Sequence, residues 1–190
     1  MAPQDVLDFW FGAPGSDGYG QARAVWFRKD DGFDALIRDR FGALIDAALA
    51  GGLEAWFDAP PPALARVLVL DQFTRNAFRD TPRAFAGDAQ ALACAREIVA
   101  RGWDLRMLPV QRWFAYLPYE HAEDIAAQRE SLRLFATLRD DPVAGAAYDW
   151  AVGHHDVIAR FGRFPHRNEI LGRASSAEEV AFLSQPGSRF

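Results

Sequence analysis

The chain has 190 residues, half of them hydrophobic, and a formal net charge of −5 at pH 7. This length favours one domain with a sizeable core, and the composition excludes an intrinsically disordered chain. The acidic balance argues against a nucleic-acid-binding protein, which would present a basic surface. Lys29 is the one lysine beside twenty arginines, so nearly every positive charge is a planar guanidinium suited to carboxylate or phosphate. We expect a single domain over residues 1–190.

The first half of the chain predicts three helices separated by glycine-rich or proline-rich segments. Each begins near a proline or an acidic residue and shows apolar residues at a spacing of three or four. Glycines follow the first two helices, where a positive φ angle commonly ends a helix. The predicted helices are residues 3–11, 33–49 and 60–72, with an exposed loop at 12–22 and a turn at 79–82.

The second half is also helical in its periodicity, and no alternating segment rich in Val, Ile or Thr predicts a strand. Gly102 and Gly162 follow two of the helices, and Ser175 with Glu178 forms a capping-box pattern before the last one. The predicted helices are residues 86–101, 105–116 (interrupted by Pro109 and Pro118), 119–138, 143–161 and a short one after Ser175. We therefore expect an all-α fold, an antiparallel array of seven to nine helices.

Two features bear on the cellular compartment. Cys94 is the one cysteine, in an apolar helical context, so disulfide scaffolds and thiolate zinc sites are excluded and a core position is expected. No basic residue precedes Arg23 and no apolar run reaches the roughly 18 residues of a membrane span. We expect a cytoplasmic protein that binds neither membrane nor nucleic acid.

Several polar residues fall on apolar helix faces. A polar group that faces a core requires either a hydrogen-bonded network or a ligand site. A network would pair Asp71 with Arg75 and His121 with Asp124, whereas a ligand site would gather side chains from different helices into one pocket. The residues are Asp71 in the helix at 60–72, His121, Asp124 and Gln128 in the helix at 119–138, and His154 in the helix at 143–161.

An arginine-rich block, R-F-G-R-F-P-H-R-N-E-I-L-G-R, occupies residues 160–173. Its arginines either pair with nearby carboxylates or clamp a phosphate or carboxylate through bidentate hydrogen bonds. With the polar helix residues, the block predicts an inter-helix pocket for a small anion and acid–base chemistry of the hydrolase type. The candidate catalytic residues are His121, Asp124 and His154; the candidate ligand-binding residues are Asp71, Arg75, Arg163, His166, Arg167, Asn168 and Arg173.

Two other functions compete with this hypothesis. Histidines and aspartates also bind metals, but neither H-E-x-x-H nor a paired E-x-x-H is present, and we predict no metal ligands. His155–Asp156 imitates a phosphohydrolase motif, yet no further aspartate follows it and both residues point away from the apolar stripe. The alternative to an anion site is a non-catalytic helical scaffold whose aromatic residues bind a protein or peptide partner. The sequence specifies no cofactor or oligomeric state.

Four segments are similar to one bacterial family. They are V-L-D-F-W-F-G at 6–12, L-D-Q-F-T-R-N at 70–76, F-A-Y-L-P-Y-E-H-A-E-D at 114–124, and the arginine-rich block at 160–173. Together they resemble the family called domain of unknown function 924 over nearly the whole chain. The resemblance implies an all-helical, tetratricopeptide-like superhelix. It implies no activity and no catalytic residues.

Overall fold

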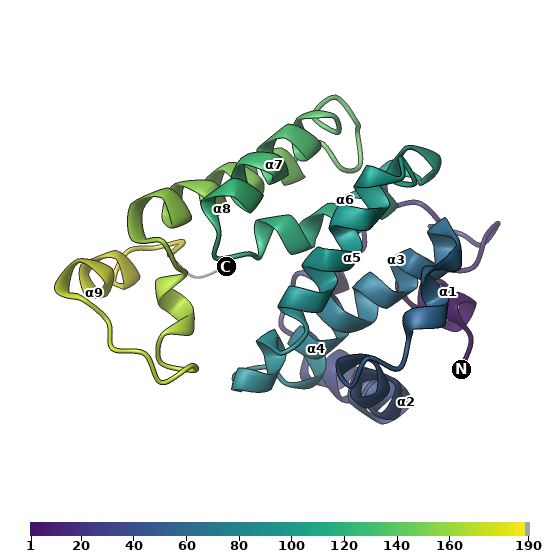
Figure 1. Ribbon diagram of the computed structural model, residues 1–190, viewed down its shortest axis with the longest axis horizontal. Coiled ribbons are helices and arrows are strands. Elements are labelled where there is room, and N and C mark those ends of the chain that lie inside the picture. The colour runs from purple at the N-terminus through teal and green to yellow at the C-terminus, as the bar shows by residue number, and fades with distance from the viewer. Residues whose placement is uncertain (189–190) are drawn as a thin grey trace.

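The computed structural model describes residues 1–188, and the described chain is helical without strands. This confirms the predicted all-α array. Figure 1 shows the helices arranged so that α7 and α8 lie side by side, while α9 lies at one edge. The helices are α1 (Pro3–Phe11), α2 (Asp31–Leu49), α3 (Pro60–Leu68), α4 (Thr74–Ala77), α5 (Asp88–Ala100), α6 (Pro109–Glu120), α7 (Ile125–Ala136), α8 (Ala147–Phe161) and α9 (Ala177–Leu183).

The helix predicted to end near Gln72 continues five residues further, because a π-helical turn joins α3 to α4. This turn, η3 (Val69–Phe73), is buried throughout its length. A π turn displaces backbone carbonyls from their usual partners, and the Thr74 hydroxyl donates to the carbonyl oxygen of Leu70 at 2.8 Å. The extra residue turns Asp71 toward the protein interior, where its carboxyl group is fully buried.

The single helix predicted over residues 119–138 is wrong. The chain instead forms α6, which contains Pro118 in its last turn, and then α7. Asp124 is the N-cap of α7, and its carboxylate accepts hydrogen bonds from the backbone N–H groups of Ala126 and Ala127 at 2.7 and 3.1 Å. An aspartate is well suited to this position because it satisfies N–H groups that have no partner within the helix. Asp124 is therefore an exposed helix cap and does not lie on an apolar helix face, contrary to the prediction.

Three further helix starts differ from the sequence-based prediction. α6 begins at Pro109 rather than at residue 105, because proline is suited to the first turn of a helix. α8 begins at Ala147 rather than at residue 143, because the Asp141 carboxylate accepts from the N–H groups of Val143 and Ala144 and holds that segment in turns. The capping box of α9 is formed by Ser176 with Glu179, one residue later than predicted.

The main core lies between α1, α2, α3, α5 and α6 and is dominated by aromatic rings. Trp10 packs edge-on against Phe114 with ring centroids 5.4 Å apart, and Phe41 contacts Phe73 at 4.7 Å. Cys94 is buried at the edge of this core, as predicted. A second, smaller apolar cluster around Phe164 joins the arginine-rich block to α8, and so fixes the position of Arg167.

None of the helices in residues 1–188 is long and apolar enough to cross a membrane.

Candidate functional site

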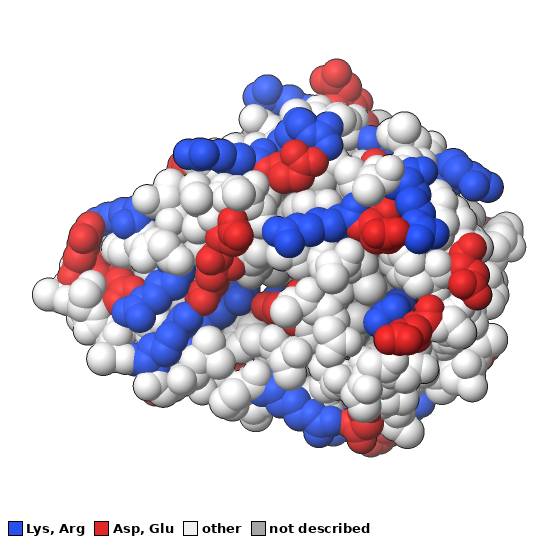
Figure 2. All heavy atoms as spheres, viewed as in Figure 1, with Lys and Arg blue, Asp and Glu red and all other residues white. Residues whose placement is uncertain are grey.

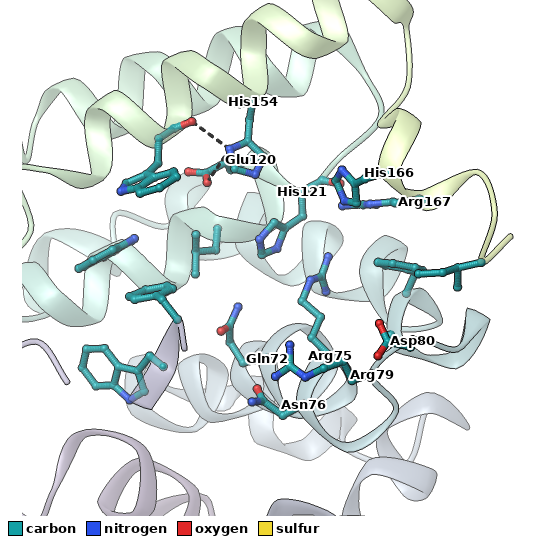
Figure 3. A pocket seen from close by; sticks show the side chains of 18 residues that line it. Gln72, Arg75, Asn76, Arg79, Asp80, Glu120, His121, His154, His166 and Arg167 are labelled. Carbon is teal, nitrogen blue, oxygen red and sulfur yellow. Dashed lines mark hydrogen bonds and ion pairs between the residues drawn. The ribbon is translucent and has the colours of Figure 1, made fainter. Parts of the chain in front are cut away.

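A cavity of about 650 Å³ lies between α4, α6, α8 and the 3-10 turn η6 (Pro165–Arg167). Figure 3 shows side chains from these separate segments facing one another across it. Eight of the lining residues are apolar: Trp26, Phe27, Ala84, Phe85, Trp113, Leu117, Trp150 and Ile170. Ten are polar: Gln72, Arg75, Asn76, Arg79, Asp80, Glu120, His121, His154, His166 and Arg167.

His121 is held by a buried aspartate. Its Nδ1 lies 2.7 Å from Oδ1 of Asp71, whose carboxyl group also accepts from the Gln72 amide at 2.6 Å. Burial opposes ionisation of Asp71, but Arg75 and His121 outweigh it and hold the pKa of that carboxyl well below its usual range. An ionised Asp71 makes Nδ1 of His121 the protonated nitrogen. Nε2 is then the basic nitrogen, on the edge of the ring that Figure 3 shows directed into the cavity.

The imidazole of His121 is neutral at pH 7. Burial and the neighbouring Arg75 lower the pKa of His121 below its ordinary value, and Asp71 only partly opposes this change. His121 lies where α6 ends, and the end of that helix is fixed by the packing of Tyr119 and Leu117. A neutral imidazole oriented by a carboxylate is the arrangement that enzymes use for a general base.

Arg75 and Arg167 share one carboxylate beside this pair. Arg75 donates to both oxygens of Asp88 at 2.8 and 3.1 Å and also lies 3.1 Å from Asp71. Arg167 donates to Asp88 at 3.2 Å and to the backbone oxygen of His121 at 3.1 Å. Its guanidinium lies between the rings of Phe85 and Phe164, 4.6 and 4.5 Å from their centroids. Burial lowers the pKa of Arg167 to about 10, so it remains charged at pH 7.

Arg79 and Asn76 extend the polar wall of the cavity along α4 and beyond its end. Both bind the buried carboxylate of Asp34 on α2, Arg79 through Nε at 2.6 Å and Asn76 through its amide at 2.8 Å. Nη2 of Arg79 also donates to Asp34, and no residue of the described chain accepts from Nη1. The carboxylates that balance Arg75 and Arg79 thus lie behind them, outside the cavity lining.

A second acid–base pair, Glu120 with His154, lies next to His121. Oε1 of Glu120 is 3.1 Å from Nδ1 of His154, whose ring centroid is 6.3 Å from that of His121. Burial, with Asp71 nearby, raises the pKa of Glu120 to about 8, and burial lowers that of His154 to about 3. Both groups are therefore neutral at pH 7. The Nδ1–H group of His154 donates to the Trp150 carbonyl at 2.9 Å.

The structure brings together five of the ten sequence-predicted site residues in the cavity wall. These are Arg75, His121, His154, His166 and Arg167, and Asp71 stands directly behind His121. The pairing of Asp71 with Arg75 is confirmed, whereas that of His121 with Asp124 is wrong because His121 binds Asp71.

The remaining four predicted residues lie outside the main cavity. Arg163 binds Glu179, Arg173 binds Glu123, and Asn168 donates to Ser175. Asp124 caps α7 and borders a smaller neighbouring cavity of about 440 Å³. Figure 2 likewise shows positive and negative side chains interspersed over one face of the molecule. Pairing with carboxylates therefore accounts for Arg163 and Arg173, and their side chains do not form the predicted clamp.

Sequence reasoning missed Glu120, Arg79, Gln72 and Asn76. Glu120 had a detectable signal, because it follows Trp113 by seven residues and so shares the buried face of α6. Gln72 lies in the π turn, Asn76 in α4 and Arg79 in the turn that follows α4, and the helix had been predicted to end at Gln72. Over residues 1–188, no three His, Cys, Asp or Glu side chains are placed to hold a metal ion.

Comparison with known proteins relates this chain to others whose activities are not established. It is 40% identical to a protein of unknown function, ATU0120, from Agrobacterium tumefaciens; the solved structure of that protein matches with a TM-score of 0.83 over 96% of each chain. No functionally curated protein matches this chain. The family model for "Bacterial protein of unknown function (DUF924)" matches residues 6–187. The chain therefore belongs to the DUF924 family, as its four sequence motifs had indicated.

Proposed function

We propose that the cavity binds a small organic anion and that His121 performs acid–base chemistry of the hydrolase type on it. One observation carries the proposal. A neutral imidazole, oriented by a fully buried carboxylate, lies in the wall of the same cavity as three arginines. Buried titratable groups with shifted pKa values in a cleft are characteristic of catalytic sites.

The arginines supply the binding part of this proposal. A guanidinium donates two parallel hydrogen bonds to a carboxylate or phosphate, and burial strengthens such bonds. Arg75 and Arg167 are rigid, since each is fixed by Asp88, while Arg79 keeps Nη1 available toward the cavity. An anion bound by these arginines would lie close to His121, which lines the same cavity (Figure 3).

The chemistry would proceed through Nε2 of His121. As a water molecule attacks the electrophilic carbon or phosphorus of the ligand, Nε2 accepts a proton from it, and the resulting imidazolium then donates that proton to the leaving group. Asp71 stabilises the transient positive charge on the ring and keeps the proton on Nδ1. Glu120 is a second proton donor, because it is neutral at pH 7 and lies beside His154 at the cavity wall.

Binding is tested by thermal denaturation of the purified protein with acetate, inorganic phosphate and phenyl phosphate. A ligand that binds only the folded state raises the unfolding midpoint. We expect Arg79→Gln to abolish this increase and the matched control Arg163→Gln to preserve it, because Arg163 is paired with Glu179 outside the cavity. Absence of a shift for every anion would refute the binding part.

Chemistry is tested with p-nitrophenyl acetate and p-nitrophenyl phosphate. We expect turnover of one ester that is lost in His121→Asn and retained in His155→Asn, since His155 lies outside the cavity lining. Equal rates in the two variants would assign any observed hydrolysis to surface histidines or to the buffer, and would remove His121 from the mechanism.

The alternative function is a tetratricopeptide-like scaffold that binds a peptide. Phe27 and Trp150, at the cavity wall, are 56% and 60% exposed, and exposed aromatic side chains often serve as anchors at interfaces. A short peptide that ends in phenylalanine with a free carboxylate is the appropriate probe, and its C-terminal amide is the control. Tight binding of both peptides, without turnover of either ester, would favour this alternative.

A further inference from the structure

Apart from Phe85, which packs against Arg75 and Arg167, the aromatic residues that line the cavity lie away from its polar cluster. From this we propose that its ligand is an amphiphilic organic monoanion, a carboxylate joined to an aromatic body. The proposal rests on the anion site proposed above and specifies its ligand class. It follows from the order of residues along two helices, from the charge balance of the arginines and from the size of the cavity.

The cavity-lining face of α6 changes from aromatic to polar along its length. Trp113, Leu117 and His121 follow one another at intervals of four residues, so they lie on one side of the helix. On α8, Trp150 precedes His154 by the same interval. The polar residue at the end of α6 meets the one in the middle of α8, because the ring centroid of His154 lies 6.3 Å from that of His121. Both helices therefore present an aromatic side chain one or more turns away from the polar cluster.

The apolar wall is a continuous aromatic surface. Phe27 stacks on Trp113 with ring centroids 4.9 Å apart and a 19° angle between the planes, and Trp26 contacts Phe27 at 6.3 Å. Trp26 and Trp113 are buried, while Phe27 and Trp150 are largely exposed. A flat ring laid against this wall would gain stacking contacts and would cover apolar surface that is otherwise exposed to water.

The polar wall has many hydrogen-bond donors but little excess charge. Each arginine that lines it is bonded to at least one carboxylate, and Asp80, which also lines the cavity, pairs with Lys29 at 3.5 Å. Four cations are thus matched by four carboxylates: Arg75, Arg79, Arg167 and Lys29 with Asp71, Asp88, Asp34 and Asp80. Because these charges cancel, a bound monoanion leaves one negative charge uncompensated, whereas a dianionic phosphate monoester would leave two, so the balance favours the ligand of lower charge.

The volume agrees with such a ligand. About 650 Å³ is within the range of sites for drug-sized molecules and is far larger than an inorganic anion requires.

The test measures dissociation constants by quenching of tryptophan fluorescence, with calorimetry as a second readout. The probes are 3-phenylpropionate, its amide, acetate and phenyl phosphate. We expect 3-phenylpropionate to bind about a hundredfold more tightly than acetate, because its phenyl group is removed from water on binding. Each tenfold gain in affinity corresponds to about 1.4 kcal/mol. The amide and phenyl phosphate should each bind at least about tenfold more weakly than 3-phenylpropionate.

Two variants test whether the aromatic wall of the cavity contacts the phenyl group of the ligand. Trp150→Ala should raise the dissociation constant of 3-phenylpropionate about tenfold and leave that of acetate unchanged. Leu105→Ala removes an exposed side chain outside the cavity and should change neither dissociation constant. Trp150 is 60% exposed, so its loss spares the fold. If acetate binds and the phenyl group adds nothing, or if phenyl phosphate binds most tightly, the monoanion proposal is refuted while the anion site stands. If no probe binds, the proposed function fails with it.

Discussion

The protonation state of Glu120 provides the sharpest test of the site. This residue is 3% exposed, and burial raises its pKa to about 8, so the folded protein keeps this proton at pH 7 while the unfolded chain releases it near 4.5. A carboxyl group whose pKa is raised on folding contributes most to stability below its unfolded pKa, and that contribution is lost as pH rises to the folded value. Glu120 should therefore make the protein progressively less stable between pH 4.5 and 8.

The magnitude follows from the two pKa values. One tenfold change in proton affinity is worth about 1.4 kcal/mol, so the difference between 4.5 and about 8 corresponds to a total loss of about 5 kcal/mol. Between pH 5 and pH 7 the loss amounts to about 2 to 3 kcal/mol. Glu120→Gln removes the titration and retains an oxygen that can accept from His154. It also places an amide N–H₂ where Oε2 has no partner, which adds a cost that does not depend on pH.

Urea unfolding at pH 5, 6 and 7 compares Glu120→Gln with the wild type. We expect the free energy of unfolding of the variant, relative to the wild type, to increase by about 2 to 3 kcal/mol from pH 5 to 7. Glu123→Gln is a matched control of opposite sign: Arg173 holds the pKa of Glu123 below its ordinary value, so that variant should lose stability at neutral pH and approach the wild type in acid. A relative stability of Glu120→Gln that does not change with pH would mean that Glu120 is ionised in the folded protein.

Three further predictions follow from single residues. Asp124→Ala removes the N-cap of α7 and should cost about 1 kcal/mol in urea unfolding; if it abolishes ester turnover instead, Asp124 is catalytic after all. Gly87→Ala should destabilise the protein by about 3 kcal/mol or more, because a Cβ there would lie 2.1 Å from the Leu70 carbonyl oxygen, and a wild-type melting temperature would contradict that close contact. Because the pKa of His121 is lowered, kcat/KM for the ester hydrolysed should decrease in acid with a midpoint below pH 6.5, and a midpoint above pH 6.5 would argue against this base.

Much of the candidate site could be recognised from the sequence because its residues contradict their surroundings. Asp71, His121 and His154 are polar residues in apolar segments, and the structure buries or half-buries each of them. Arg167 is likewise buried at the cavity wall. Arg163 and Arg173, which belong to the same block, instead pair with Glu179 and Glu123 outside the main cavity. Composition could not separate these cases, because the separation depends on which glutamate folds beside which arginine.

The sequence by itself determined the all-α class, most helix positions and the family, because apolar periodicity, proline and glycine act over a few residues. Only the tertiary structure decided which polar residues share a cavity. Because of the break between α6 and α7, Asp124 is a helix cap. His121 instead forms a hydrogen bond with Asp71, fifty positions earlier in the chain. The π turn η3 then aligns Arg75 and Arg79 with Arg167. Such contacts arise from packing between distant segments, which no local pattern encodes.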